Sequence, residues 1–472
     1  MFTQYERTLE RFRDIIAFGE SFDILSHTLS IGEGEVTLFY IDGFVKDAQL
    51  EKLMTTLIGE KTLLSRDAFI RRLPQIEVGT ESDLSRASHA LLSGQTVLFS
   101  SSFPEECLTL DLRTYPTRSL SEPESDRVMQ GARDGFVETL IFNTVLIRRR
   151  IRDTRLRMEH FTIGGASGTD IVLCYMQGVA KKSLVDEVTR KLHRIRPESL
   201  TLGFQSLAES FLRGGWLNPF PKVRSTERPD TAAAELVEGA VLVLCDTSPQ
   251  AMILPTSAFD YLQQTDDFYF PPLTGTYLRL VRTLIFLLSV VATPLWYLAV
   301  RYQTILPPNL AFLIPEESAI PLLWQLLLVE VAIDGLKIAS LNTPNTLSSS
   351  LSIIGGLILG DFAVGVGWLT QDVILYMAFV AVATFAGQNP ELGYALKFVR
   401  IISLLFSAWL GIWGFAISMV IFVLLLLTNR TVTSQSYLYP LIPFSPKALL
   451  RLFVRVPKYD FGKREKKNAK EP

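Results

Sequence analysis

The sequence is poor in the residues that build disulfide frameworks. Its 472 residues include only three cysteines, an odd number, at positions 107, 174 and 245. Cys174 and Cys245 stand inside apolar runs typical of strands, IVLCYM and VLVLCD. Because buried cysteines behave as small apolar side chains, we expect reduced, buried thiols rather than a disulfide or metal framework.

Metal-binding and catalytic motifs are also missing. The four histidines are far apart and none has a metal-ligand spacing such as HExxH, so we expect no metal site. The glycine-rich segment GGASG (164–168) joins two apparent strands and is not followed by GKS or GKT. We interpret it as a hairpin loop, because phosphate binding uses the amides of a helix N-terminus. No GxSxG is present either, so we expect neither an enzyme nor a cofactor.

Neither a secretory signal nor a basic domain is evident. The first twenty residues are charged throughout and have no apolar core, so we expect the N-terminal half to stay in the cytoplasm. Lys and Arg total 46 against 48 Asp and Glu, and a basic excess, 9 against 3, is confined to residues 446–472. We therefore expect no nucleic-acid partner, and we expect this tail to attract anionic membrane lipid.

Charge is distributed very unevenly along the chain. Residues 1–282 include 32 basic and 38 acidic residues, whereas residues 283–445 include only 5 and 7. The first composition is typical of a soluble region, and the second is typical of a membrane-spanning region. We predict an α/β two-subdomain cytoplasmic N-terminal region followed by an α-helical polytopic membrane domain. The predicted divisions are subdomain 1 (1–118), subdomain 2 (128–270), a membrane domain of about four to six helical segments (283–428) and a basic cytoplasmic tail (429–472).

The α/β prediction depends on the pattern of the N-terminal region. Both predicted subdomains show strand-like runs interspersed with segments of helical period, which indicates an α/β or α+β sheet. The polar segment 116–128, rich in Pro and Ser, marks the division between them.

The membrane prediction depends on five apolar runs. The run 283–300 has no charge and is long enough to cross a bilayer. Arg279 and Arg282 precede it and the basic tail follows the last run, so both ends prefer the cytoplasm and the number of crossings is even. The alternatives that remain open are a re-entrant segment, at 319–333 or at 373–386, or a hairpin within the last run, 398–428.

Three charges in or beside the second apolar run fall on one helical face. Glu330, Asp334 and Lys337 lie at i, i+4 and i+7. In one interpretation Lys337 neutralises a carboxylate in an internal ion pair near a helix end. In the other, the remaining carboxylate faces a water-filled pathway, because an unpaired charge in lipid costs at least ~3 kcal/mol. Glu330 and Asp334 are therefore candidates for an ion pathway.

Asp361 stands near the middle of a glycine-rich apolar run, with no basic residue within a helical turn. Gly356 and Gly360 have the spacing that permits close helix packing. Two interpretations remain open: Asp361 hydrogen-bonds neighbouring helices or pairs with Arg400, or a ring of such carboxylates from several subunits lines a cation-selective pore.

Several stretches together resemble one protein family. They are DGFVETLIFNTVLIRRRI (134–151), NPFPKVRSTERPDTAAAELVEGAVLVLCDTSP (218–249) and the apolar C-terminal half. These stretches are similar to the A-subunit type of the GerA family of spore germination proteins. Within the family, FYIDGFVKD (39–47), LCDTSP (244–249) and YLYPLIPFSPKALLRLFVR (437–455) resemble the stage V sporulation protein AF branch.

The resemblance implies a protein of the bacterial spore inner membrane that acts in germination with other spore membrane germination proteins. It also implies a membrane domain that assembles as a homo-oligomeric ion channel, which amplifies the release of cations. A non-conducting scaffold for germinant receptors and a germinant-sensing A subunit are the alternatives. Family positions carried over from the motif are Pro219, Phe220, Pro221, Thr226, Glu227, Arg228, Pro229 and Asp230.

Physical roles for part of this motif can be suggested from residue type. Asp230 can cap a helix over 231–238. Glu227 and Arg228 are suited either to contacts within the domain or to a bridge between subunits.

Overall fold

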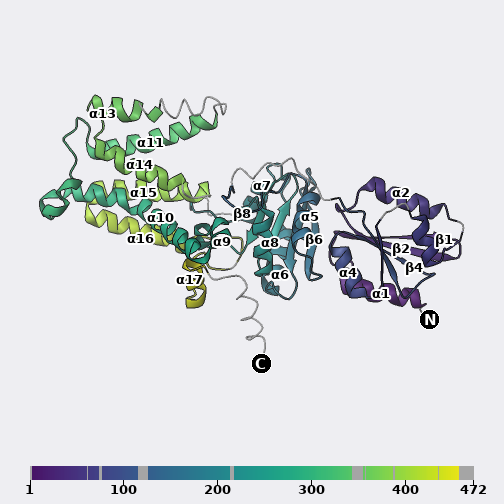
Figure 1. The fold of residues 1–472 in the computed structure, drawn as a ribbon. Helices are drawn as coiled ribbons and strands as arrows, with labels where there is room; N and C mark the ends of the chain where they lie inside the picture. Colours follow the sequence, from purple (N-terminus) through teal and green to yellow (C-terminus); the bar gives the residue numbers. More distant parts are fainter. Residues whose placement is uncertain are drawn as a thin grey trace. The chain divides into compact units, whose positions relative to one another are not determined.

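The structure is a computed structural model. It describes residues 3–60, 62–73, 77–114, 126–212, 217–342, 355–356, 358–385, 389–433 and 435–455. The chain divides into two compact units, both drawn in Figure 1. The α/β unit consists of Met1–Gly214, Val223–Thr256 and Thr431–Gln435, and the helical unit consists of Gly215–Lys222, Ser257–Arg430 and Ser436–Pro472. The chain therefore passes from one unit to the other more than once.

The first half of the α/β unit, residues 3–114, is an antiparallel sheet in the order β1-β2-β4-β5-β3. On one face, Phe12 of α1 packs against Phe39 and Phe99, with ring centroids 5.1 and 4.9 Å away. On the other face, Leu53 of α2 and Phe69 of α3 join the strand side chains. The elements are α1 (Gln4–Ile16), β1 (Ile24–Ile31), β2 (Gly34–Ile41), α2 (Asp47–Ile58), α3 (Arg66–Arg72), β3 (Val78–Glu81), α4 (Leu84–Leu92), β4 (Thr96–Ser100) and β5 (Cys107–Leu110).

The second half, residues 126–256, repeats this architecture with strand order β6-β7-β9-β10-β8 (Figure 1). Helices α5 and α8 pack on one face of the sheet, and α6 and α7 pack on the other. Its elements follow one another in the same order as those of the first half. They are α5 (Leu140–Arg150), β6 (Leu156–Ile163), β7 (Thr169–Met176), α6 (Lys182–Arg194), α7 (Phe204–Phe211), β8 (Arg224–Thr226), α8 (Pro229–Val237), β9 (Val241–Cys245) and β10 (Ala251–Leu254).

Helix α5 also contacts the first half of the α/β unit. Its Val145 is part of the core around Phe12, and a Cβ on Gly43 would lie 2.7 Å from the Val145 Cγ2 atom. Arg148, fully buried, donates from Nε to Asp23 Oδ2 at 2.9 Å and from Nη2 to Ser21 Oγ at 3.1 Å. The two halves therefore share a core and a buried ion pair.

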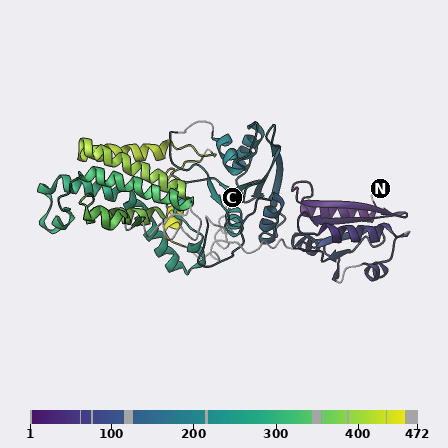
Figure 2. The same ribbon diagram turned by 90° about the horizontal axis from the view of Figure 1, so that it is seen from above.

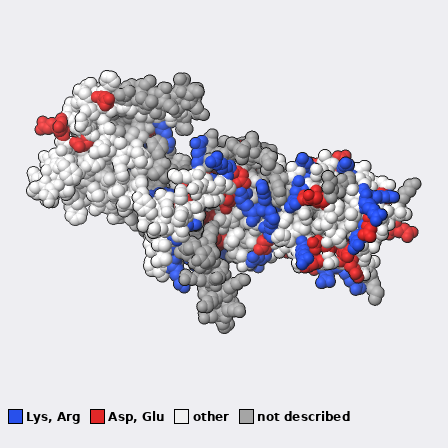
Figure 3. Space-filling model, in the orientation of Figure 1, with Lys and Arg blue, Asp and Glu red and all other residues white. Residues whose placement is uncertain are grey.

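The helical unit is built mainly from long apolar helices. In the described part of the chain, α10 and α15 are long and apolar enough to cross a membrane, and α14 and α16 are shorter apolar helices. The surface of this unit in Figure 3 is mostly free of charge. The elements are η1 (Ala258–Leu262), α9 (Asp266–Tyr269), α10 (Pro272–Arg301), η2 (Gln303–Ile305), η3 (Pro308–Leu313), α11 (Leu322–Leu341), η4 (Ile358–Phe362), α13 (Ala363–Gly365), α14 (Gln371–Phe385), α15 (Pro390–Leu410), α16 (Ile412–Thr428) and α17 (Pro446–Phe453).

The last apolar run, 398–428, is broken at Gly411, which has a φ of 64°. This left-handed conformation favours glycine and ends α15, and α16 begins at the next residue. A Cβ on Gly414 would lie only 1.9 Å from the Phe406 carbonyl oxygen, so the two helices approach closely. They lie side by side in both views (Figures 1 and 2). The last apolar run is therefore two packed helices, and the number of membrane crossings stays a prediction.

Several sequence expectations are confirmed in the described residues. The N-terminal region is α/β and the C-terminal region is helical. All three cysteines are buried and free, and residues 164–168 connect the antiparallel pair β6 and β7. Two boundaries differ from those predicted. Residues 217–222 and 257–270 belong to the helical unit instead of subdomain 2, and residues 429–455 of the predicted tail are folded into the two units.

Candidate functional site

The candidate site is a cluster of four charged residues between apolar helices. Glu330 and Asp334 lie one turn apart on α11, and Lys397 and Arg400 lie one turn apart on α15. Arg400 Nε donates to Glu330 Oε1 at 2.6 Å. Lys397 Nζ donates to Asp334 Oδ2 at 2.5 Å and to the Glu330 carbonyl oxygen at 2.9 Å, and it lies 3.3 Å from Glu330 Oε2.

The four formal charges of this cluster cancel, two acidic against two basic. Glu330, Lys397 and Arg400 are each less than 10% exposed. Loss of one partner would leave a buried unpaired charge, which typically costs about 3–5 kcal/mol. The cations that bind the two carboxylates come from α15, whereas Lys337, the residue considered in the sequence, has its Nζ 4.6 Å from the Tyr394 ring centroid. Within one chain, neither carboxylate of α11 is left over.

Arg400 also ties this cluster to α10 at its proline. Its Nη1 donates to the Ser289 carbonyl oxygen at 2.9 Å. Pro294, inside α10, has no N–H for the carbonyl one turn earlier, which weakens the helix at this level. The Arg400 guanidinium therefore joins α10, α11 and α15 where α10 has fewer backbone hydrogen bonds.

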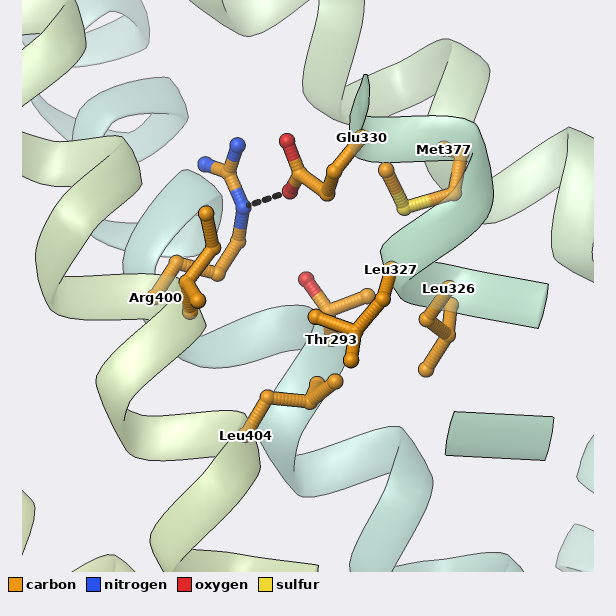
Figure 4. Close-up of a pocket in the computed structure, with 8 residues that line it drawn as sticks. Thr293, Leu326, Leu327, Glu330, Met377, Arg400 and Leu404 are labelled. Carbon is orange, nitrogen blue, oxygen red and sulfur yellow. Dashed lines mark hydrogen bonds and ion pairs between the residues drawn. The ribbon is translucent and has the colours of Figure 1, made fainter. Parts of the chain in front are cut away.

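A small cavity lies beside the ion pair (Figure 4). It measures about 190 Å³ including its open mouth, and Glu330, Arg400, Thr293 and apolar side chains line it. The Thr293 hydroxyl is buried and has no hydrogen-bond partner in the part of the chain that the structure describes.

Asp361 lies apart from this cluster. Its side chain is exposed, on the π-helical turn η4. Arg400 is bound to Glu330 and Ser289, so the pairing of Asp361 with Arg400 considered from the sequence is not found. A Cβ on Gly356 or Gly360 would meet nothing within 4 Å, so within one chain these glycines border open space. Among the described residues, their predicted packing role has no partner helix, and it stays a prediction.

The PFP part of the sequence motif belongs to the helical unit. Phe220 is 2% exposed and packs among residues of α10 and α15, with its ring 5.9 Å from that of Phe422 in α16. Asn218 Nδ2 donates to the Leu425 carbonyl oxygen at 2.7 Å. Pro221 O accepts from Asn429 Nδ2 at 3.3 Å. Residues 218–221, which include Pro219, are thus anchored to the end of α16.

The TERPD part of the motif lies in the α/β unit, at the β8–α8 junction. Arg228 is fully buried, and its Nε and Nη2 bind the Asp230 carboxylate at 3.1 and 2.8 Å. Its Nη2 also donates to the Ala132 carbonyl oxygen at 2.7 Å. Asp126 Oδ2 accepts from Thr226 Oγ1 at 2.8 Å and from the Glu227 amide at 2.9 Å. The motif therefore holds the segment 126–132 against the β8–α8 junction.

The structure differs from the role suggested for Asp230, and for Arg228 it has the contacts within the domain that were one of the two alternatives. Asp230 lies inside the first turn of α8, after Pro229, so it accepts from the Thr231 amide at 2.8 Å instead of standing at the N-cap. Arg228 has its side chain enclosed within the α/β unit, which leaves no exposed guanidinium for a bridge between subunits.

Sequence reasoning missed three residues of these sites. Lys397 and Asp126 are remote in sequence from their partners, and Thr293 is one hydroxyl in a long apolar helix. Lys397 carried a usable signal, because it and Arg400 are two of only five basic residues in 283–445, where every charge requires a partner.

The two-unit division and the motif at 218–230 agree with the resemblance of the sequence to the GerA family of spore germination proteins. The pattern of the Bacillus/Clostridium GerA spore germination protein family matches residues 14–467, and the chain belongs to that family.

Individual relatives span nearly the whole chain. Stage V sporulation protein AF of Bacillus subtilis (strain 168) is 34% identical over 95% of this chain and 92% of its own length. Spore germination protein KA of the same organism is 28% identical over 96% of this chain and 85% of its own length. A solved structure, the N-terminal domain of the A subunit of the Bacillus megaterium spore germinant receptor GerK3, is 23% identical over 52% of this chain and 92% of that chain, with a TM-score of 0.37.

Proposed function

We propose that this chain is a subunit of an oligomeric cation channel in the spore inner membrane, which amplifies germination by releasing monovalent cations. Helices α10, α11, α14, α15 and α16 and the segment with η4 and α13 would cross the membrane. That even number of crossings leaves the α/β unit and the basic tail on the cytoplasmic, spore-core side. Ion flow would follow a conformational opening, without covalent catalysis.

The observation that carries the proposal is the exposed Asp361 in an apolar unit. An ionised carboxylate facing lipid costs at least ~3 kcal/mol, so the site needs water or a partner molecule. Open space at Gly356 and Gly360 allows a second copy to approach this helix. Copies arranged around a common axis would place several Asp361 carboxylates on one aqueous path, where they would attract cations.

The neutral cluster of Glu330, Asp334, Lys397 and Arg400 has a supporting role in this proposal. Its charges hold α11 against α15 and leave Asp361 as the carboxylate available to the path. The Arg400 contact at the weakened turn of α10 is a place where the helices can shift during opening. Glu330 and Asp334 would reach the pathway only if this cluster separates.

Reconstitution in liposomes loaded with potassium tests the proposal. We expect the wild-type protein to release potassium, and Asp361→Asn to reduce the preference for cations over anions by about tenfold, because the local negative potential is lost. Asp372→Asn, at the start of α14, is the matched control and should keep the wild-type preference. A symmetric oligomer with no leak would favour the scaffold alternative, and an unchanged Asp361→Asn variant would remove this residue from the path.

A further inference from the structure

The short helix α17 is held firmly at the beginning of α10. Arg279 Nη1 donates to the carbonyl oxygens of Arg451 and Leu452, at 3.1 and 3.3 Å, at the C-terminal end of α17. A cation is favourable at the C-terminal end of a helix, where the helix dipole is negative. Leu452 is 7% exposed, and the Arg455 amide donates to Thr276 Oγ1 at 3.1 Å. Helix α17 is thus a docked element with a fixed inner face.

The anchor of α17 is itself fixed by a buried acid. Asp267 is fully buried, and its Oδ2 accepts from Arg279 Nε at 3.2 Å and from Arg282 Nη1 at 3.0 Å. A Cβ on Gly275 would lie 2.9 Å from Arg455 Cδ and 2.3 Å from the Asp267 carbonyl oxygen. Only a residue without a side chain permits this approach. The start of α10 therefore packs closely against both the loop before it and the chain after α17.

The outer face of α17 combines basic and apolar side chains. Lys447, Leu450, Arg451 and Val454 are exposed, at the i, i+3, i+4 and i+7 spacing of one helical face. Leu450 is 60% exposed, and Phe444, just before the helix, is 67% exposed. Exposed large apolar side chains beside Lys or Arg side chains, which are long enough to reach lipid headgroups, are typical of helices that lie in a membrane interface.

The level of α17 along α10 fits that interface. Arg279, which holds α17, precedes the charge-free run that begins at Thr283 by four residues, or about 6 Å of helix. The exposed side chains Leu273, Tyr277 and Leu280 follow the same lipid-facing side of α10, and Tyr277 is of the type enriched at headgroup level. Helix α17 is therefore held at the level at which α10 would enter the bilayer.

We propose that α17, with Phe444, is an interfacial foot that binds the surface of an anionic phospholipid bilayer. The inference rests on the proposed membrane location. Lys447 and Arg451 contact headgroup phosphates, while Leu450, Val454 and Phe444 enter the boundary with the acyl chains. Because Arg279 clamps α17 onto α10, the charge of the cytoplasmic leaflet acts directly on the position of α10.

A fluorescent label at residue 450 tests this foot. The full chain with Leu450→Cys is labelled with a polarity-sensitive thiol probe, since the native cysteines are buried. It is then reconstituted in nanodiscs of phosphatidylcholine, with or without phosphatidylglycerol, that contain a headgroup-level lipid quencher. We expect strong quenching in the anionic discs and weak quenching in the neutral discs. Adding Lys447→Gln and Arg451→Gln should lower the preference for anionic discs by about 30-fold.

Matched variants separate the possible failures. Lys52→Gln with Arg71→Gln removes two exposed cations of the α/β unit and should leave the quenching unchanged. A label at Leu284→Cys reports membrane insertion of α10. If residue 284 is quenched and residue 450 is not, the foot is overturned while the membrane location stands. If neither is quenched, both are overturned. Equal quenching of residue 450 in the two kinds of disc overturns the recognition of anionic lipid.

Discussion

The two halves of the α/β unit share their order of helices and strands, but different side chains stabilise the turn from the third strand into the last helix of each half. In the first half, the turn from β3 into α4 is closed by Asp83, whose Oδ1 accepts from the Ser85 amide at 2.8 Å. In the second half, the corresponding turn from β8 into α8 contains the buried Arg228 and its Asp230 partner. A plain N-cap is sufficient for this topology, so the fold alone does not require the motif.

What differs is the chain around the second junction. Arg228 binds the carbonyl oxygen of Ala132, and Asp126 binds the Thr226 hydroxyl, so the junction organises the chain that leads into α5. The residues just before β8 are anchored in the helical unit through Phe220. The comparison teaches that the motif serves the connections of the second half, at the point where the chain passes from the helical unit into the α/β unit.

The largest effect is expected at the ion pair that joins the halves. In Arg148→Ala, the Asp23 carboxylate, 1% exposed, would lose both guanidinium contacts. We expect a loss of about 3–5 kcal/mol in the free energy of unfolding, measured by urea titration with hydrogen exchange in β1 and β6. The exposed neighbour provides a control, since Arg149→Ala should change stability by less than about 0.5 kcal/mol. Equal effects of the two variants would mean that the halves do not depend on this pair.

The next effect directly compares the two junctions. Arg228→Ala would leave Asp230, 15% exposed at its side chain, without its cation and free the carbonyl of Ala132, at an expected cost of about 3 kcal/mol. Asp83→Ala in the first half would remove only a cap, at a cost of about 1 kcal/mol. Hydrogen exchange of the full chain should show lost protection in α8 and in residues 126–136 for the first variant, and in α4 alone for the second.

The opposite ranking of these two variants would break the comparison. If Asp83→Ala proved as costly as Arg228→Ala, both junctions would be general requirements of the fold. If Arg228→Lys showed wild-type hydrogen-exchange protection in α8 and in residues 126–136, a positive charge alone would be sufficient to stabilise this junction. The two-pronged geometry of the guanidinium would then be unimportant.

The central strands of the two sheets could be predicted from the sequence, whereas some of the edge strands could not. The runs now seen as β2, β7 and β9 were recognisable because their apolar residues are buried on both faces of a sheet. The edge strands β3 and β8 were missed, since VGTE and RST are short and have no alternation of apolar residues. Two like halves were therefore not apparent, because their similarity lies in topology.

The site was predicted only as far as local spacing reaches. Glu330 and Asp334 share a face because of helical geometry, and this holds in the structure. Their cations lie more than sixty residues later in the chain, at Lys397 and Arg400. Pairing over that separation depends on how α11 and α15 pack together, and the periodicity of apolar residues does not predict which helices pack together. The same reason explains why Phe220 was assigned to the α/β region.

The smallest effect concerns thiol reactivity in the two halves. Burial raises the pKa of Cys107 in β5 and of Cys245 in β9 to about 12. At pH 8 the folded thiolate fraction is then about one in 10,000, so alkylation requires local opening. Both β5 and β7 lie between two strands, but the edge strand beside β5 is β3 with four residues, whereas the edge strand beside β7 is β6 with eight, so Cys107 should react before Cys174. Because these pKa values are raised in the folded state, the contribution of the two thiols to stability is complete below about pH 9 and is lost as the pH rises towards 12. Mass spectrometry after timed alkylation measures the order, and simultaneous labelling of the three cysteines would mean that the two halves open as one cooperative unit.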